Sequence, residues 1–153
     1  MEKSGNQQQF SVAIGSDHAG FQLKEQLKKY LQEKGIATKD FGTYSEERAD
    51  YPDYGHLVAS AVEKKEYDFG LLMCGSGNGI NMTANKHKKI RSALCWNSEI
   101  AKLAREHNDA NVLVLPARFI SVDEAKACVD VFYTTAFEGG RHADRIAKIS
   151  DGC

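Results

Sequence analysis

Residues 69–81 read FGLLMCGSGNGIN, and this stretch decides the fold. An apolar run of strand length ends at Cys74, and a glycine-rich turn then leads into a helical pattern. A short apolar run bounded by turn residues is typical of a strand buried in a parallel sheet. Glycines allow the backbone to approach a ligand closely. The stretch therefore predicts a buried strand that delivers a cysteine to a ligand-binding turn.

The same alternation of strand and helix continues on both sides of this stretch. Strands are predicted at residues 10–15, 36–41, 69–74, 92–96 and 112–115, and helices at residues 21–33, 54–65, 79–88, 99–106, 122–137 and 140–149. Ser121 followed by Glu124 predicts a capping box at the start of the long helix near the end of the chain. Alternation of this kind indicates a parallel sheet with helices on both faces. We therefore predict an α/β protein, a single doubly wound, Rossmann-like α/β/α sandwich with a five-stranded parallel sheet, over residues 10–150.

Composition excludes several classes of function. The chain has 153 residues, with 20 basic and 21 acidic side chains and a formal charge of −1. This balance argues against nucleic acid as a partner, and no apolar run is long enough to span a membrane. Residues 1–9 are polar, resemble no targeting peptide, and are predicted to be a flexible tail. The four cysteines have neither zinc-ligand spacing nor the density of a disulfide scaffold, so we expect a cytoplasmic protein.

The turn after Cys74 is the strongest candidate site. Successive backbone N–H groups of a glycine-rich turn can form a nest that binds an anion, and a cysteine beside a helix N-terminus tends toward the reactive thiolate. A tight turn preceded by a merely buried cysteine is the alternative. Three familiar glycine loops do not fit, because Ile80 stands where a P-loop needs lysine, where a dinucleotide fingerprint needs glycine, and where a cysteine phosphatase needs arginine.

Three other groups carry residues suited to a sugar phosphate. Asp17 and His18 follow the first strand, although they could simply be a helix cap and an exposed histidine. His107 and Asn108 end a helix, where a histidine can act as a partner of the helix dipole, and Arg118 follows the next strand. Arg141 and Arg145 are one helical turn apart, a spacing suited to a phosphate or to an exposed basic face.

The order of these motifs resembles the ribose-5-phosphate isomerase B family, which also includes galactose- and allose-6-phosphate isomerases. The motifs are SDHAG at residues 16–20, RADYP at 48–52, CGSGNG at 74–79, ANK at 84–86, EHND at 106–109 and EGGRH at 138–142. The resemblance covers about residues 10–150. It implies an aldose–ketose isomerase of the pentose phosphate pathway, which interconverts D-ribose 5-phosphate and D-ribulose 5-phosphate through an enediolate without metal or cofactor.

The resemblance also implies a role for each candidate residue. Cys74 would be the base that moves a proton between C1 and C2, Ser76 would help to move the hydroxyl proton, and His107 would open the sugar ring. The backbone of Gly75, Ser76, Gly77, Asn78 and Gly79 would hold the enediolate oxygen, since preorganised donors stabilise developing negative charge. The remaining substrate contacts would come from Asp17, His18, Tyr51, Asn108, Arg118, Arg141 and Arg145.

One branch of the family lacks the cysteine and has a glutamate where this chain has Ile80, so this chain resembles the cysteine branch. In the family, His107 and Arg118 would reach the site of a partner subunit, which implies a homodimer with shared active sites and leaves a tetramer open. Two alternatives remain at this point: an isomerase of a hexose 6-phosphate such as allose or galactose 6-phosphate, and a non-catalytic regulator that binds a phosphosugar.

Overall fold

Five parallel strands form the centre of the molecule, which a computed structural model describes over residues 10–153. The strands are β1 (Ser11–Ser16), β2 (Ala37–Asp40), β3 (Phe69–Cys74), β4 (Ser92–Leu94) and β5 (Val112–Pro116), in the order β2-β1-β3-β5-β4. Every neighbouring pair is parallel, as predicted. The predicted tail at residues 1–9 lies outside the described residues.

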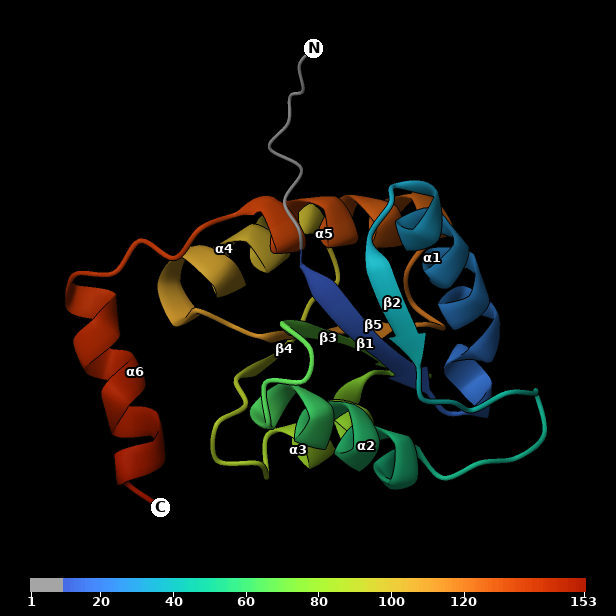
Figure 1. Cartoon of the computed structure of the whole chain (residues 1–153), viewed down its shortest axis with the longest axis horizontal. Helices are drawn as coiled ribbons and strands as arrows, with labels where there is room; N and C mark the ends of the chain where they lie inside the picture. The colour runs from blue at the N-terminus through green and yellow to red at the C-terminus, as the bar shows by residue number, and fades with distance from the viewer. Residues whose placement is uncertain (1–9) are drawn as a thin grey trace, which may run out of the picture.

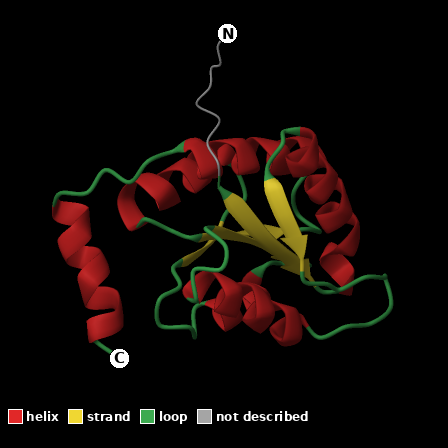
Figure 2. Ribbon diagram, in the orientation of Figure 1, coloured by secondary structure: helices red, strands yellow, loops and turns green. Residues whose placement is uncertain are grey.

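Helices cover both faces of this sheet. On one face lie α1 (Phe21–Glu33), α4 (Ser98–Asn108) and α5 (Val122–Thr134), and on the other lie α2 (Tyr51–Glu63) and α3 (Asn78–Ala84). Figure 1 shows these two layers above and below the sheet, and Figure 2 shows the strands enclosed between them. A short 3₁₀ helix, η1 (His18–Gly20), joins β1 to α1. The predicted doubly wound architecture is confirmed.

Alternating side chains of the central strands supply two separate cores. In β3, Leu71 and Met73 pack into the core beneath α1, α4 and α5, whereas Leu72 and Cys74 pack into the core beneath α2 and α3. This alternation follows from the two-residue period of a strand. The Cys74 side chain therefore lies on the side of the sheet that α2 and α3 cover.

The last helix, α6 (Arg141–Asp151), stands apart from both layers. None of its residues is buried, and Figure 1 shows it at the left, beyond the end of α4. Its sequence is strongly amphipathic, so its apolar residues lack the cover that such a helix normally has. Within residues 10–153, no helix combines the length and the apolar character that a membrane crossing requires.

Most differences from the predicted elements lie at their ends. Helix α2 begins at Tyr51 and not at residue 54, because Pro52 occupies the first turn, where its missing N–H costs nothing. Helix α3 ends at Ala84 and not at residue 88, since the Asn85 side chain bonds to the backbone of Ser92. Helix α5 ends at Thr134, three residues before the predicted end.

The predicted capping box forms only in part. The Ser121 hydroxyl accepts a hydrogen bond from the Glu124 N–H at 3.0 Å, as expected. The Glu124 carboxylate, however, accepts one from the Ser98 N–H at 2.9 Å and so caps α4 instead of its own helix. A tertiary contact thus replaces the local reciprocal bond of a capping box.

Candidate active site

The centre of the candidate site is the turn that joins β3 to α3. Cys74, the last residue of β3, is buried, and its carbonyl accepts a hydrogen bond from the Ala117 N–H at 2.9 Å. The Gly75 carbonyl accepts one from the Arg118 N–H, also at 2.9 Å. These two bonds tie the start of the turn to the segment that leaves β5.

Glycine is required within this turn. Gly77 has a φ of +81°, in the left-handed region that side chains disfavour, and a Cβ there would collide with Leu94. The Ser76 hydroxyl accepts a hydrogen bond from the Asn78 N–H at 3.2 Å, which closes the turn and leaves both side chains exposed. The backbone of residues 75–79 is therefore held in a tight arch over the end of β3.

Two side chains from other elements lie against this arch. The ring of Tyr51, at the start of α2, occupies the space that a Cβ on Gly79 would need. The side chain of Arg118 lies beside Gly75, where its Nη1 would be 3.2 Å from a Cβ at that position. Both residues were predicted to contact substrate, and the fold brings both to the arch. A tyrosine and an arginine at its rim offer a phenol and a positive charge to a ligand.

Asp17 and His18 lie at the same edge of the sheet, because β1 is the neighbour of β3 and Ser16 pairs with Met73. The Asp17 carboxylate is buried, and its Oδ1 atom accepts a hydrogen bond from the Gly20 N–H at 3.1 Å and so caps η1. The Nδ1 atom of His18 lies 3.1 Å from both the N and the O atoms of Ala49, which leaves Nε2 to meet a ligand.

Ile80 stands at the position where the sequence resemblance implies a glutamate in the branch that lacks the cysteine. Its side chain is fully buried in the core beneath α2 and α3, together with Cys74. An alkyl side chain cannot accept a proton, and this one does not reach the open side of the turn. Cys74 is therefore the only side chain of residues 74–80 with the chemistry of a carbon-proton base.

His107 and Asn108 lie at the opposite edge of the sheet. Helix α4 starts after β4 and runs back, so its last residues precede the first residue of β5, Val112. Val112 pairs with Gly70 at the start of β3, whereas Pro116 pairs with Cys74 at its end. Four strand residues span about 13 Å, so His107 and Cys74 of one chain are at least that far apart along the sheet.

His107 has two close neighbours near the start of α6. Its ring stacks on the ring of His142, with centroids 4.3 Å apart and planes at 14°. The Nε2 atoms of His107 and His142 lie 3.9 and 3.6 Å from the same Glu138 carboxylate oxygen. The Glu138 N–H donates to the Glu106 carbonyl at 3.0 Å and thereby holds the loop against the end of α4.

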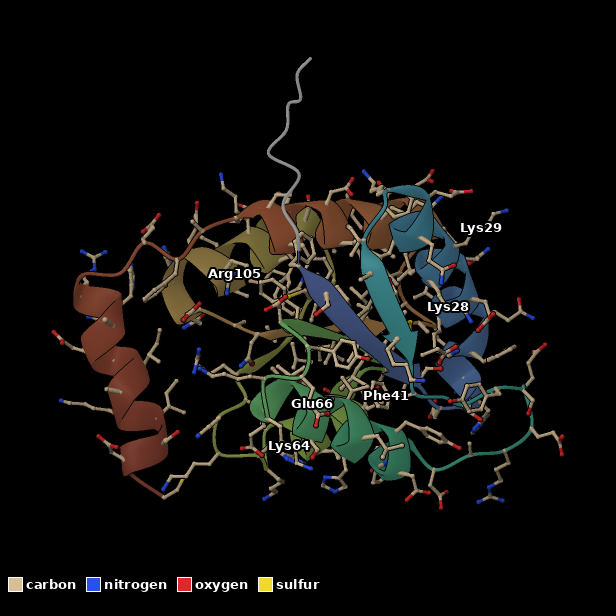
Figure 3. All side chains as sticks on the ribbon, in the orientation of Figure 1. Lys28, Lys29, Phe41, Lys64, Glu66 and Arg105 are labelled. Atoms are coloured by element: carbon tan, nitrogen blue, oxygen red, sulfur yellow. The ribbon has the colours of Figure 1, made fainter. Side chains whose placement is uncertain are left out.

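The end of α4 is itself firmly anchored. Arg105, which is labelled in Figure 3, is buried and donates to the Asp109 carboxylate at 2.9 Å, to the Ala110 carbonyl at 2.6 Å and to the Thr135 carbonyl at 3.1 Å. These bonds join α4, the start of β5 and the segment after α5. His107 thus projects from a rigid base.

The predicted phosphate-binding residues do not form one group within the chain. His18 and Arg118 lie at the carboxyl edge of the sheet, with Cys74. Arg141 and Arg145 are exposed on α6, which Figure 1 shows on the far side of the molecule from the tips of β1 and β2. Arg118 contacts the turn of its own chain, so its predicted reach into a partner's site is not needed to bring it to a Cys74.

Glu138 and His142 were not among the predicted site residues. The sequence contains a signal for their proximity, since they are four residues apart. Residues 138–140 are not helical, however, and both Gly139 and Gly140 have positive φ values. The contact of Glu138 and His142 with His107 depends on how the chain returns from α5 to the end of α4, which no local sequence pattern reveals.

A doubly wound parallel sheet with a glycine arch, a thiol and polar groups at its carboxyl edge is the arrangement with which α/β proteins bind small anionic ligands. A family model described as Ribose/Galactose Isomerase matches residues 12–149, and the chain belongs to that family of enzymes. The resemblance to this family that the sequence predicted is thereby confirmed.

Characterised relatives are similar over almost their whole length. Ribose-5-phosphate isomerase B of Escherichia coli is 44% identical over 139 residues, which cover 91% of this chain and 93% of that protein. The crystal structure of a ribose 5-phosphate isomerase from Thermotoga maritima matches with a TM-score of 0.92 and 51% identity, over 93% of this chain and 98% of that one. The Mycoplasma genitalium enzyme, solved with bound ribulose-5-phosphate, matches with a TM-score of 0.89 and 43% identity, over 94% and 95% of the two chains.

Proposed function

We propose that this protein is a ribose-5-phosphate isomerase, which interconverts D-ribose 5-phosphate and D-ribulose 5-phosphate with Cys74 as its base. The observation that carries the proposal is the position of Cys74 at the head of the glycine arch, with Ile80 buried behind it. The relatives named above support the same substrate, because all three are called ribose-5-phosphate isomerases and one of them was solved with bound ribulose-5-phosphate.

In the proposed reaction, the Cys74 thiolate removes the proton from C2 of the open-chain aldose. The electron pair of the C–H bond forms the C1–C2 double bond of an enediolate, and the negative charge moves to the oxygen on C1. The backbone N–H groups of residues 75–79 stabilise that oxygen, as preorganised donors do for developing charge. Ser76 helps to transfer the hydroxyl proton from O2 to O1. The thiol then returns its proton to C1, which yields the ketose.

Ribose 5-phosphate exists mainly as a ring, so the reaction needs an acid that opens it. We assign that step to His107, with Asn108 beside it holding the substrate. Asp17 and Tyr51 contact the sugar hydroxyls, and the phosphate is bound by His18, Arg118, Arg141 and Arg145. An arginine fork binds phosphate oxygens through two parallel hydrogen bonds, which suits a terminal phosphate.

These assignments require a second copy of the chain. His107 and Cys74 of one chain lie at opposite edges of its sheet, and α6 with its two arginines lies at the His107 end. A two-fold dimer can place the His107 edge of one protomer over the Cys74 edge of its partner, and it does so twice. We therefore infer a homodimer with two shared active sites as the smallest functional unit.

The proposal is tested by supplying the purified protein with ribose 5-phosphate in D₂O, with allose 6-phosphate and galactose 6-phosphate as comparators. We expect ribulose 5-phosphate to form, to carry deuterium at C1, and to form with a kcat/KM above that of either hexose phosphate. Deuterium enters because the cysteine proton exchanges with solvent. A faster reaction with a hexose 6-phosphate would replace the pentose assignment, and binding without turnover of any of the three would indicate a phosphosugar-binding regulator.

A further inference from the structure

We propose that His107, Glu138 and His142 form a binding site for a divalent transition-metal ion, of which Zn²⁺ is the representative. Among residues 10–153, this is the one group of three potential ligand side chains whose donor atoms all lie within 4.8 Å of one another. Two imidazole nitrogens and one carboxylate oxygen are a ligand set that Zn²⁺ uses with three protein ligands and one open position. Nitrogen donors also favour Zn²⁺ over the oxygen-seeking Mg²⁺ and Ca²⁺.

The geometry is close to what such an ion needs. Both Nε2 atoms already face one oxygen of Glu138, at 3.9 Å from His107 and 3.6 Å from His142. Two donor atoms, nitrogen or oxygen, that bind one tetrahedral Zn²⁺ at the usual bond lengths are about 3.4 Å apart, which is close to these two distances. The two rings are nearly parallel at present, so each must tilt to direct its lone pair at a shared ion. The side chains of His107 and Glu138 are 40% and 52% exposed and have room to move, whereas the His142 side chain is only 12% exposed, so most of the adjustment falls to His107 and Glu138.

Hydrogen bonds fix the backbone around the three ligands. Arg105 anchors the end of α4, and the Glu138 N–H is bonded to the Glu106 carbonyl. His142 lies in the first turn of α6, where its N–H bonds to the Gly139 carbonyl at 3.2 Å. Three ligands on a rigid base lose little backbone entropy when an ion binds, which favours binding.

An ion at this site would occupy the Nε2 atom of His107. If His107 opens the sugar ring, as proposed above, metal binding would remove that acid and so would inhibit the enzyme. This expected inhibition rests on the proposed function. Zn²⁺ would thus regulate the reaction without taking part in it, which keeps the isomerisation itself metal-free.

Binding is measured by calorimetric titration of ZnCl₂, in phosphate-free buffer, into the full chain carrying Cys153→Ser, which removes the exposed thiol. We expect one Zn²⁺ per chain. Glu138→Gln and His142→Gln should each lower the affinity for Zn²⁺ by at least 10- to 100-fold, because a loss of that size occurs even when a residue that only orients a metal ligand is removed. Asp144→Asn, a carboxylate removed from the same helix but outside the cluster, is the matched control and should bind like its parent. Co²⁺ in place of Zn²⁺ should give visible d–d bands without a thiolate charge-transfer band, because no cysteine is a ligand.

Unchanged affinity in both ligand variants, absence of binding to the parent, or a thiolate band with Co²⁺ would each overturn the site. The kinetic consequence is measured separately, as Zn²⁺ inhibition of turnover from cyclic ribose 5-phosphate in the parent and in Glu138→Gln. We expect Zn²⁺ to inhibit the parent, and Glu138→Gln to need at least 10-fold more Zn²⁺ for the same inhibition. If Zn²⁺ binds the cluster and turnover continues, the metal site stands and the ring-opening assignment of His107 fails.

Discussion

The four cysteines of the chain differ in what surrounds each sulfur. Burial raises the pKa of both Cys95 and Cys128 to about 12, with a further contribution from Cys128 to the first and from Glu124 to the second. Those two thiols remain protonated and unreactive at neutral pH. Cys153 is exposed at the end of the chain, and Cys74 lies at the head of the glycine arch. Chemistry at sulfur is therefore expected at Cys74 alone among the buried cysteines.

Cys74→Ala is expected to abolish isomerisation while leaving substrate binding intact. Loss of a catalytic base typically lowers kcat by 10²- to 10⁴-fold or more. Binding persists because the arch, the arginines and Asp17 are unchanged. The variant is assayed for turnover of ribose 5-phosphate and for affinity by calorimetry. If kcat stays above about a tenth of the wild-type value, far outside that range, Cys74 is not the base.

An alkylating reagent should inactivate the protein by modifying Cys74. In a Cys153→Ser background, we expect one modified thiol per chain at full inactivation, and slower loss of activity when ribose 5-phosphate is present. Peptide mass spectrometry identifies the modified residue. Modification of Cys95 or Cys128 at the rate of inactivation would contradict the assignment, because the raised pKa of these two thiols should keep them protonated and unreactive.

A second residue-level feature is the buried ion-pair cluster around Asp40. Its carboxylate accepts hydrogen bonds from Lys24 at 2.6 Å and from Lys28 at 2.8 Å, and the Lys24 side chain is completely buried (Lys28 is labelled in Figure 3). Burial alone would raise the pKa of Asp40, but the hydrogen bonds from Lys24, Lys28 and the Gly42 N–H hold that pKa below its usual value. The cluster therefore joins β2 to α1, and it does so only while the Asp40 carboxyl group is ionised.

Asp40→Asn is expected to lower the free energy of unfolding by about 2 kcal/mol at pH 7. This loss is smaller than the loss expected when one partner of a fully buried ion pair is removed, because Glu25 still contacts Lys24 at 2.8 Å. The sign of the pH effect follows from the lowered pKa. Stability from ionised Asp40 is present above its unfolded pKa and is lost as the pH falls through the folded value. The gap between variant and wild type should thus shrink below about pH 4.

Urea unfolding at pH 7 and at pH 3 measures both quantities. Glu47→Gln, which removes an exposed carboxylate from the following loop, is the matched control and should leave stability within about 0.5 kcal/mol. An equal loss in Asp40→Asn at both pH values would show that the carboxylate charge does not carry the stabilisation.

At the scale of elements, α6 is the helix that packs least against the rest of its own chain. It buries no residue, yet it presents Arg141 and Arg145 one turn apart. Each charge-assisted hydrogen bond contributes about 1.5–3 kcal/mol, so Arg145→Ala should weaken ribose 5-phosphate binding about 10-fold or more. Lys148→Ala removes a positive charge from the same helix and serves as the control. Calorimetry that finds equal affinity in wild type and Arg145→Ala would remove Arg145 from the phosphate site.

Elements with a strong local pattern were predictable from the sequence. The β3 run, the glycine turn and the alternation of strand and helix follow from side-chain periodicity, which is local. Helix ends were less accurate, because side-chain contacts outside the helix decide them: Asn85 stops α3 by bonding to Ser92, seven residues later, and Glu124 caps α4 instead of completing its own box. Side-chain periodicity does not reveal which partner such a polar side chain will find.

The candidate site was predictable to the same extent. Cys74, Asp17 and Arg118 follow neighbouring strands, and the carboxyl ends of parallel strands share one edge, so their proximity follows from topology. The positions of His107 and Arg145 could not be derived in this way. They depend on where α4 ends and on where α6 leaves the body of the chain. The cluster with Glu138 and His142 depends on the same return of the chain.

At the scale of the whole molecule, the proposed catalytic residues are divided between two ends. Cys74 and the arch lie at the carboxyl edge of the sheet, while His107, Arg141 and Arg145 lie at or beyond the opposite edge. A groove of about 630 Å³ separates the far end of α6 from the body of the protein, with Ile149 and Cys153 on one side and Ile90 and Ala93 on the other. Helix α6 buries no residue within its own chain, which suits contact with the partner subunit proposed above.

The most direct test of this account combines two inactive variants, Cys74→Ala and His107→Asn, in one dimer. In the proposed homodimer, a two-fold axis gives two sites, each built from the cysteine of one protomer and the histidine of its partner. In the mixed dimer, one site receives both substitutions and the other receives none. Random mixing gives about half mixed dimers with one working site each, so activity should return to about a quarter of wild type.

The two chains are co-expressed with different affinity tags, mixed dimers are isolated by both tags in turn, and turnover is measured from cyclic ribose 5-phosphate. Isolated mixed dimers should show about half of the wild-type activity per dimer, and each parent variant almost none. Mixed dimers no more active than their parents would contradict the shared site, since each site would then lie within one chain or would not use these two residues.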